Sequence, residues 1–512
     1  MTRSSAKRSQ LVAGVSSRRA QARRTDPRKE ASINRVQSLI QGRRDARRPT
    51  TTFALQGHSA TQPNQQPETG AVRLPSVTRR VALPLIALCI VACNNQSAPV
   101  AIKKVVQPPA SAADLKAASR RSLYAEFIKH PTGRNGFEDY LKAADALSEP
   151  TASAAYYAVQ NRTTSRGSSP VPEAEWAKGI SLLDLKRNLR DKTKDAFALI
   201  KSGNQKPFVS TISHDPLKGE MFGVTAFLNR ATREACLISD AEVADGHTSE
   251  ATDLLLGEIE FQNQVGSDDV ISDLSANNMT SVVLKQFDIH MSVLKAEDYA
   301  AIVSRTDALL RKPPKLMLAF DRQLKTDLQW MNLVIDEGAN SKPRDPKTLS
   351  GDSVEYERVN SEVRKLSPSE LKAMKTSAAK VVSDAYSQIH NTLQGPEAKW
   401  PARTGTPPVA PKTLIGDVTR GHLPFLDACS NEARTRTQLR ILRLRALIES
   451  YRLKNSRLPS SLADLSTPDA TADPYAASQF NYTVSGDTYN VSSAMTDKGF
   501  PIEMVRRLPP KK

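Results

Sequence analysis

The stretch LRILRLRALIESYRLKNSRLPSSLADL, residues 439–465, decides the fold class at the C-terminal end of this chain. Its apolar residues Leu444, Leu447, Ile448 and Tyr451 recur at the spacing of one helical face. The pattern predicts a long amphipathic helix, and the Leu-Pro-Ser-Ser-Leu motif that follows it predicts a turn.

The next segment, DPYAASQFNYTVSGDTYNVSSAM at residues 473–495, changes from helical to strand periodicity. Apolar residues alternate with polar ones on both sides of the Ser-Gly-Asp-Thr turn at 485–488, which is typical of a β-hairpin. We therefore expect residues 414–512 to form a small α+β module built from a long helix and a hairpin.

Residues 113–337 carry repeated helical periodicity, few glycines and no strand alternation. One helical hairpin is predicted to turn at Gly246, with Thr248 or Ser249 as the N-cap of its second helix. The chain is thus predicted to be mainly α, an antiparallel helical array. Both a solenoid and a closed bundle fit this pattern.

Two breaks divide the rest of the chain. Residues 338–396 read as a linker and a further helix, which Ser367 or Ser369 is placed to cap. Residues 397–413 are Pro-rich and read as a second linker.

The basic charge of the chain is concentrated at one end. The formal net charge is +18, and residues 1–80 hold 17 Lys and Arg against 4 Asp and Glu, so the remainder is nearly balanced. This distribution argues against a nucleic-acid-binding body. Residues 1–80 have few large apolar residues and are predicted to be a disordered basic segment. Alternatively the start is mis-assigned, and translation begins at Val72, Leu74 or Val77.

The segment TRRVALPLIALCIVAC, ending at Cys93, has the order of an export signal. Arg79 and Arg80 precede an uncharged apolar run at residues 81–92. This run is shorter than the roughly 20 residues that a membrane-spanning helix needs, and its length fits a signal-peptide hydrophobic region.

The last residues of this run, Ile90, Val91 and Ala92 before Cys93, resemble the lipobox of bacterial lipoproteins. The resemblance implies cleavage before Cys93 and its lipidation, with residues 93–112 as a tether to the membrane. Asn94 in the next position then favours the periplasmic face of the outer membrane over the inner membrane. A conventional cleaved signal is the alternative, and the Arg79-Arg80 pair is also partly similar to a twin-arginine signal.

Export also bears on the two remaining cysteines, Cys236 and Cys429. In an oxidising compartment they are able to form a disulfide. The alternative is two separate buried thiols that act as small apolar residues. The sequence does not decide between these two.

The C-terminal region resembles the C-terminal part of the major pseudopilin of type II secretion. It also resembles the last segment of a functionally unnamed set of bacterial envelope proteins with a long helical region. The matching residues are Arg445, Ala446, Leu447, Tyr451, Arg452, Leu458, Pro459, Ser461, Leu462, Leu465, Asp473, Pro474 and Tyr482. A pseudopilin's assembly helix directly follows a leader, which is not the case here, so polymerisation into a pilus is not expected.

The sequence contains no strong catalytic, phosphate-binding or metal-ligand motif, and no cofactor is predicted. Glu258 and Glu260 fall on different sides of a predicted helix, so they do not indicate a paired-carboxylate site. We therefore favour a non-enzymatic binding or scaffold protein of the envelope, with a protein or glycan partner and no nucleic acid. An envelope-polymer hydrolase or lyase that uses His214 or His422 is one alternative. An accessory of a secretion or pilus system is the other.

Overall fold

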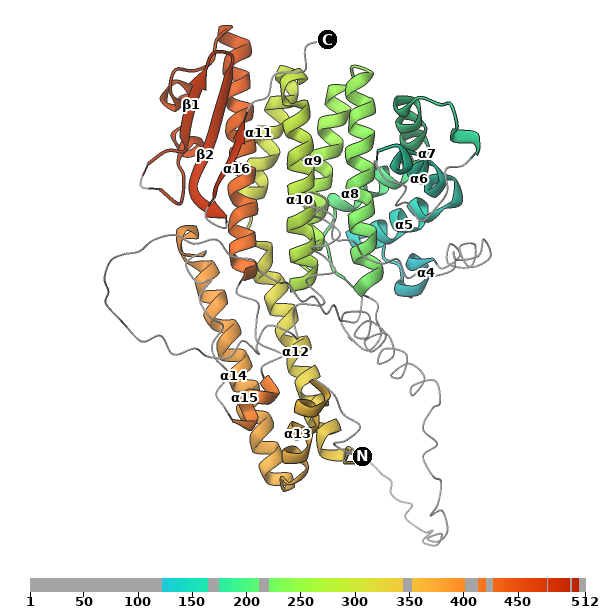
Figure 1. The fold of residues 1–512 in the computed structure, drawn as a ribbon, viewed down its shortest axis with the longest axis vertical. Helices are drawn as coiled ribbons and strands as arrows, with labels where there is room; N and C mark the ends of the chain where they lie inside the picture. Colours follow the sequence, from blue (N-terminus) through green and yellow to red (C-terminus); the bar gives the residue numbers. More distant parts are fainter. Residues whose placement is uncertain are drawn as a thin grey trace, which may run out of the picture. The chain divides into compact units, whose positions relative to one another are not determined.

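A computed structural model describes residues 122–163, 175–210, 221–343, 352–400, 413–419, 427–476, 478–497 and 500–505. The predicted basic segment, export signal and tether lie outside these residues, as do residues 401–412 of the Pro-rich linker. The described part is mainly helical with a small antiparallel sheet near its C-terminal end (Figure 1), which confirms the predicted fold class.

Among the first helices of the described chain, α7 is the one on which α5 and α6 both pack. The elements are α4 (Leu123–Phe127), α5 (Gly136–Ser148), α6 (Pro150–Thr163), η1 (Glu175–Ala177) and α7 (Leu182–Asn204). Helices α5 and α6 both contact α7. At the α5–α7 contact, Gly136 and Gly203 face each other so closely that a Cβ on either would overlap the other helix.

The predicted helical hairpin at Gly246 is present. Helix α8 (Met221–Ala244) packs on α9 (Thr248–Val265), and Gly246 has a φ of +83°, which glycine adopts without strain. The predicted N-cap is wrong, because His247 occupies that position and makes no side-chain cap hydrogen bond. The Ser249 hydroxyl instead donates to Asp298 of α11 (Ala296–Arg311), at 2.8 Å.

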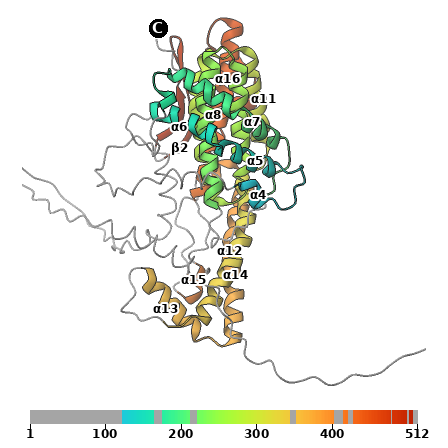
Figure 2. The same cartoon turned by 90° about the vertical axis from the view of Figure 1, so that its right-hand side faces the viewer.

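Four elements continue the array: α10 (Val270–His290), η2 (Met291–Val293), α11 (Ala296–Arg311) and α12 (Lys315–Asn340). Helix α12 then packs with α13 (Asp352–Arg364) and α14 (Pro368–Gln394), and both α13 and α14 contact the short α15 (Leu414–Thr419) (Figure 2). The short η4 (Glu397–Lys399) follows α14. The cap of α14 is confirmed as Ser367, whose hydroxyl accepts from the Glu370 amide in a capping box.

The C-terminal region begins with the long helix α16 (Asp427–Asn455), followed by η7 (Leu462–Leu465) and α17 (Pro468–Thr471). The predicted hairpin is confirmed as β1 (Asn481–Ser485) and β2 (Thr488–Asp497), with Tyr482 opposite Val491. A third strand, β3 (Phe500–Val505), pairs antiparallel with β2 and was not predicted. Pro501 within it hides the strand pattern, and proline is tolerated there because β3 is an edge strand.

Helix α16 lies between the sheet and the helical array and is buried on two sides (Figure 1). Ile441, Leu444 and Ile448 belong to a core shared with α12, α14 and the sheet. Leu439, Leu442 and Ala446 belong to a second core shared with α9, α10 and α11. The apolar packing therefore runs without a break from the helical array into the C-terminal region.

Candidate functional site

Most site residues predicted from the sequence lie outside the described residues. These are Cys93, the signal residues Arg79 and Arg80, the lipobox residues Ile90, Val91 and Ala92, and the two histidines His214 and His422. Lipidation and histidine-based catalysis therefore stay predictions. None of the described helices is long and apolar enough to cross a bilayer.

The two remaining cysteines are placed by the structure. Cys236 of α8 and Cys429 of α16 are both buried, and neither is in a disulfide. They belong to different cores, Cys236 to that of α9, α10 and α11 and Cys429 to that of α12, α14 and the sheet. Burial raises the pKa of the Cys236 thiol, so this group stays protonated. The structure thus corresponds to two separate buried thiols, and the disulfide alternative is not realised.

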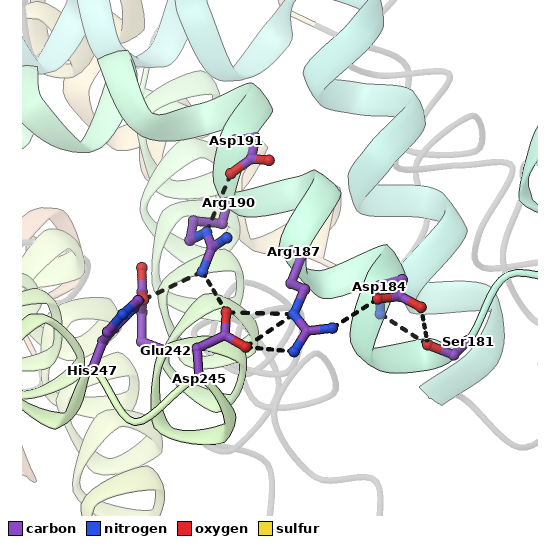
Figure 3. Close-up of polar contacts among 8 residues, drawn as sticks. All are labelled: Ser181, Asp184, Arg187, Arg190, Asp191, Glu242, Asp245 and His247. Atoms are coloured by element: carbon purple, nitrogen blue, oxygen red, sulfur yellow. Dashed lines mark hydrogen bonds and ion pairs between the residues drawn. The ribbon is translucent and has the colours of Figure 1, made fainter.

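An ion-pair network joins α7 to the turn between α8 and α9 (Figure 3). Arg187 Nη2 lies 2.5 Å from Asp245 Oδ1, and Arg190 Nη1 lies 2.9 Å from Asp245 Oδ2. Hydrogen bonds from Arg187 and then Arg190 lower the pKa of Asp245 to about 2, so it stays ionised in neutral solution. Arg187 also pairs with Asp184, which in turn accepts from the Ser181 hydroxyl.

Glu242 extends this network along α8. Its Oε2 atom lies 3.1 Å from His247 Nδ1 and 3.4 Å from Arg190 Nη1 (Figure 3). Arg190 is therefore held by two carboxylates from the α8–α9 hairpin. Charge-assisted contacts of this kind fix a planar guanidinium in both position and orientation.

Next to this network is a hollow of about 180 Å³ where α7, α8 and α9 meet. Three apolar residues line it, one from each helix: Phe197, Ile238 and Leu254. Four charged residues complete the lining, with Arg190 and Lys194 from α7, Glu242 from α8 and Glu250 from α9. We call these seven residues the three-helix hollow. It combines apolar contact area with positive charge from α7 and negative charge from α8 and α9.

Sequence reasoning missed the three-helix hollow because its residues come from three separate segments. Only the i, i+4 spacing of Arg190 and Lys194, of Ile238 and Glu242, and of Glu250 and Leu254 was visible. That spacing shows which residues share a helical face, but it does not show which faces meet.

A wider, more open hollow of about 660 Å³ lies beside β1. Its lining is Ala472, Ser478, Gln479, Phe480, Asn481 and Tyr482. Since this lining carries no ionised side chain at neutral pH, it offers less specific recognition than the three-helix hollow.

Two buried carboxylates, Glu234 of α8 and Glu258 of α9, form a second notable cluster. Burial raises the pKa of each carboxyl to about 7. The Arg230 charge partly offsets this rise at Glu234, and hydrogen bonds from Thr232 and Gln262 partly offset it at Glu258. As the sequence indicated, Glu260 faces away from Glu258, and it pairs with Arg305 of α11 at 2.8 Å. Neither buried carboxylate lines the two hollows described above, so they bear on stability rather than on a substrate.

Helix α8 also carries Ser239 and Asp240 beside His290 of α10, the residue types of a hydrolytic triad. Ser239 Oγ lies 3.2 Å and Asp240 Oδ1 lies 3.3 Å from the same imidazole atom, Nε2. A triad requires the serine and the carboxylate on opposite ring nitrogens. Ser239 is also fully buried and donates to the carbonyl of Cys236, so this arrangement does not activate a nucleophile.

A buried lysine joins three helices in the described chain. Lys315 Nζ of α12 donates to Asn277 Oδ1 at 2.7 Å and lies 3.4 Å from Asp273 Oδ1, both on α10. Glu432 of α16 is 3.9 Å away. Burial raises the pKa of Asp273 despite the lysine, and the cluster holds α10, α12 and α16 together.

Comparison with known proteins gives no relative: no family model matches the chain, and no curated protein or solved structure matches it. The functional argument therefore rests on the chain's own residues, and the three-helix hollow is the candidate site.

Proposed function

We propose that this chain is a lipid-anchored protein of the bacterial cell envelope that binds a partner without catalysing a reaction. The three-helix hollow is the observation that carries the binding role. Its surface is mainly apolar, charged residues of α7, α8 and α9 complete its lining, and ion pairs to Asp245 and Glu242 hold its Arg190 in place. None of its seven lining residues is a serine, cysteine or histidine.

The envelope location is supported by the sequence alone. The order of Arg79 and Arg80, the apolar run at 81–92 and Cys93 is that of a lipoprotein signal. Several acyl chains on Cys93 would anchor the protein stably, because one chain gives only reversible binding. Residues 93–112 would then hold the helical body away from the periplasmic face of the outer membrane.

The intact mass of the protein from membranes of a bacterial host tests this proposal. We expect a chain that begins at an acylated Cys93. Cys93→Ser should abolish acylation and cleavage at this site, whereas Cys89→Ser, in the same apolar run, should leave both unchanged. A chain that retains residues 1–92 without lipid would exclude the lipoprotein function.

A further inference from the structure

We propose that the free edge of β1 binds an extended, uncharged segment of another polypeptide, which adds to the sheet as an antiparallel strand. The proposal is independent of the three-helix hollow and of the envelope location, because it rests on other residues. β1 is an edge strand and pairs with β2 on one side only (Figure 1). Such a strand presents backbone groups that an extended chain can pair with.

The register of the β1–β2 hairpin shows which backbone groups face outwards. Ser485 pairs with Thr488 across a two-residue turn, so Ser485 and every second residue before it bond to β2 through the backbone. The N–H and C=O groups of Tyr482 and Val484 therefore point to the free edge. Within the described part of the chain, these groups form no backbone hydrogen bond. They offer alternating donors and acceptors at the spacing of a strand.

The fold already uses the neighbouring part of this edge for an antiparallel pairing. Ala472 forms an isolated bridge with Gln479, and the Phe480 amide donates to the Thr471 carbonyl at 2.9 Å. The open hollow of about 660 Å³ lies at the same place, since Ala472 and residues 478–482 line it. An added strand would continue this pairing along β1, and the hollow gives room for its end.

The side chains of β1 favour an uncharged segment in which apolar and polar residues alternate. Neither β1 nor the lining of the hollow carries a charged residue. Val484 is 43% exposed although it is apolar, and Tyr482 lies on the same side of the sheet. A β-branched residue opposite each of them would cover this apolar area, and a threonine would suit Thr483 on the other side.

The other edge of the sheet contains residues that discourage such pairing. β3 includes Pro501, which has no backbone N–H, and the charged residue Glu503. β1 includes neither a proline nor a charged residue. This difference indicates that β1 is the edge that is open to a partner strand.

A capped peptide, acetyl-Thr-Val-Thr-Val-Thr-amide, tests the proposal on the full chain labelled with isotopic tyrosine. We expect the Tyr482 amide signal, assigned by its loss in Tyr482→Phe, to shift saturably in nuclear magnetic resonance spectra. The expected dissociation constant is on the order of 1 mM, because each backbone hydrogen bond replaces one to water and contributes little. The signal of Tyr140, which is buried in α5, should not move.

Two changes place the binding at the edge. Val484→Pro removes the outward N–H but no hydrogen bond to β2, so it should weaken binding at least about tenfold. Its matched control is Val484→Thr, which keeps this N–H and the β-branched shape and should bind like the wild type. A peptide with both valines N-methylated lacks the N–H groups that would face β1. It should also bind at least about tenfold more weakly, and this result does not depend on how a variant folds.

Absence of a saturable Tyr482 shift would overturn the proposal, and so would equal binding of the N-methylated peptide. A Tyr482 shift that depends on protein concentration alone would mean that a second copy of this chain covers the edge, which would also overturn it. All of these results leave the lipoprotein proposal standing, because the mass of the acylated Cys93 species is measured separately.

Discussion

Two glutamates, Glu234 and Glu258, make the stability of this fold depend on pH. Each has an ordinary carboxyl pKa of 4.5 that burial raises to about 7 in the folded chain. The folded state therefore binds these protons more tightly than the unfolded state does. The stability that the two groups contribute is complete below pH 4.5, falls as the pH rises from there to 7, and stays lost above it.

Glu258→Gln should remove most of the pH dependence of folding stability that comes from Glu258. Its Oε1 atom accepts from Thr232 and Gln262, and the amide oxygen of glutamine can accept both bonds. The rise of the Glu258 pKa from 4.5 to about 7 corresponds to a loss of at most about 3 kcal/mol in the free energy of unfolding between pH 5 and pH 8. Urea unfolding at these two pH values should show a smaller loss of stability for the variant than for the wild type.

The exposed Glu250→Gln serves as the control for this measurement and should follow the wild type at both pH values. If Glu258→Gln lost as much stability as the wild type on raising the pH, Glu258 would not be the group that titrates in this range.

The sequence held one usable indication of this pair. Glu234 precedes Gly246 by twelve residues and Glu258 follows it by twelve, so the two lie at the same level of the predicted hairpin. Sequence spacing gives the position of a residue along a helix, but its burial depends on which other elements pack over that position. The same holds for Arg445 of α16, whose burial periodicity does not reveal: it is 1% exposed and pairs with Asp288 of α10 at 2.6 Å.

At the scale of elements, the contact between α5 and α7 depends on two glycines. A Cβ at Gly203 would overlap the ring of Tyr140, and one at Gly136 would overlap the backbone of Gly203. Gly203→Ala should therefore force the helices apart and lower the free energy of unfolding by about 1–3 kcal/mol, the usual range for overpacking. Urea unfolding monitored by circular dichroism measures this loss.

Gly257→Ala in α9 is the matched control for Gly203→Ala. Its Cβ would meet no atom closer than 3.7 Å, so the gain in helix propensity of about 1 kcal/mol should dominate. Equal destabilisation by the two substitutions would show that the close α5–α7 contact is not what restricts Gly203.

The start of α14 gives another prediction for a single element. The Ser367 hydroxyl accepts from the Glu370 amide, and the Glu370 carboxylate accepts from the Ser367 amide at 2.8 Å. Ser367→Ala should cost about 1 kcal/mol in the free energy of unfolding, as is usual for a lost N-cap. The control is Ser369→Ala. The Ser369 hydroxyl contacts the Ser367 hydroxyl but does not cap the helix, so thermal melts should show a much smaller effect for this variant.

Local patterns decided which elements the sequence predicted correctly. The Gly246 turn, the Ser367 cap and the β1–β2 hairpin each depend on residues close together in the chain. The prediction of the α9 N-cap was wrong because the Ser249 hydroxyl donates a hydrogen bond to Asp298, which is distant in sequence. The three-helix hollow and β3 were missed because the first joins three separate helices and the second is masked by Pro501.

At the scale of the whole described chain, α16 belongs to the predicted C-terminal module but packs in two cores, both of which contain residues of the predicted helical domain 113–337. Ile441 packs with α12, α14 and the sheet, whereas Leu442, the next residue, packs with α9, α10 and α11. Both side chains are fully buried. Because α16 is one continuous helix, we infer that neither core unfolds without disturbing the other.

Ile441→Ala and Leu442→Ala test this coupling, since each leaves a cavity in one core only. Each should cost about 2–5 kcal/mol, and both should shift the same unfolding transition, seen alike by circular dichroism and tryptophan fluorescence. Lys454→Ala, an exposed change near the end of α16, should leave that transition in place. Two transitions, one moved by Ile441→Ala and the other by Leu442→Ala, would mean that α16 belongs to two independent units. Coincident shifts would instead mean that destabilising the C-terminal region also destabilises the helices around the three-helix hollow. The reason is that Leu255 and Leu256 of α9 share a core with Leu442.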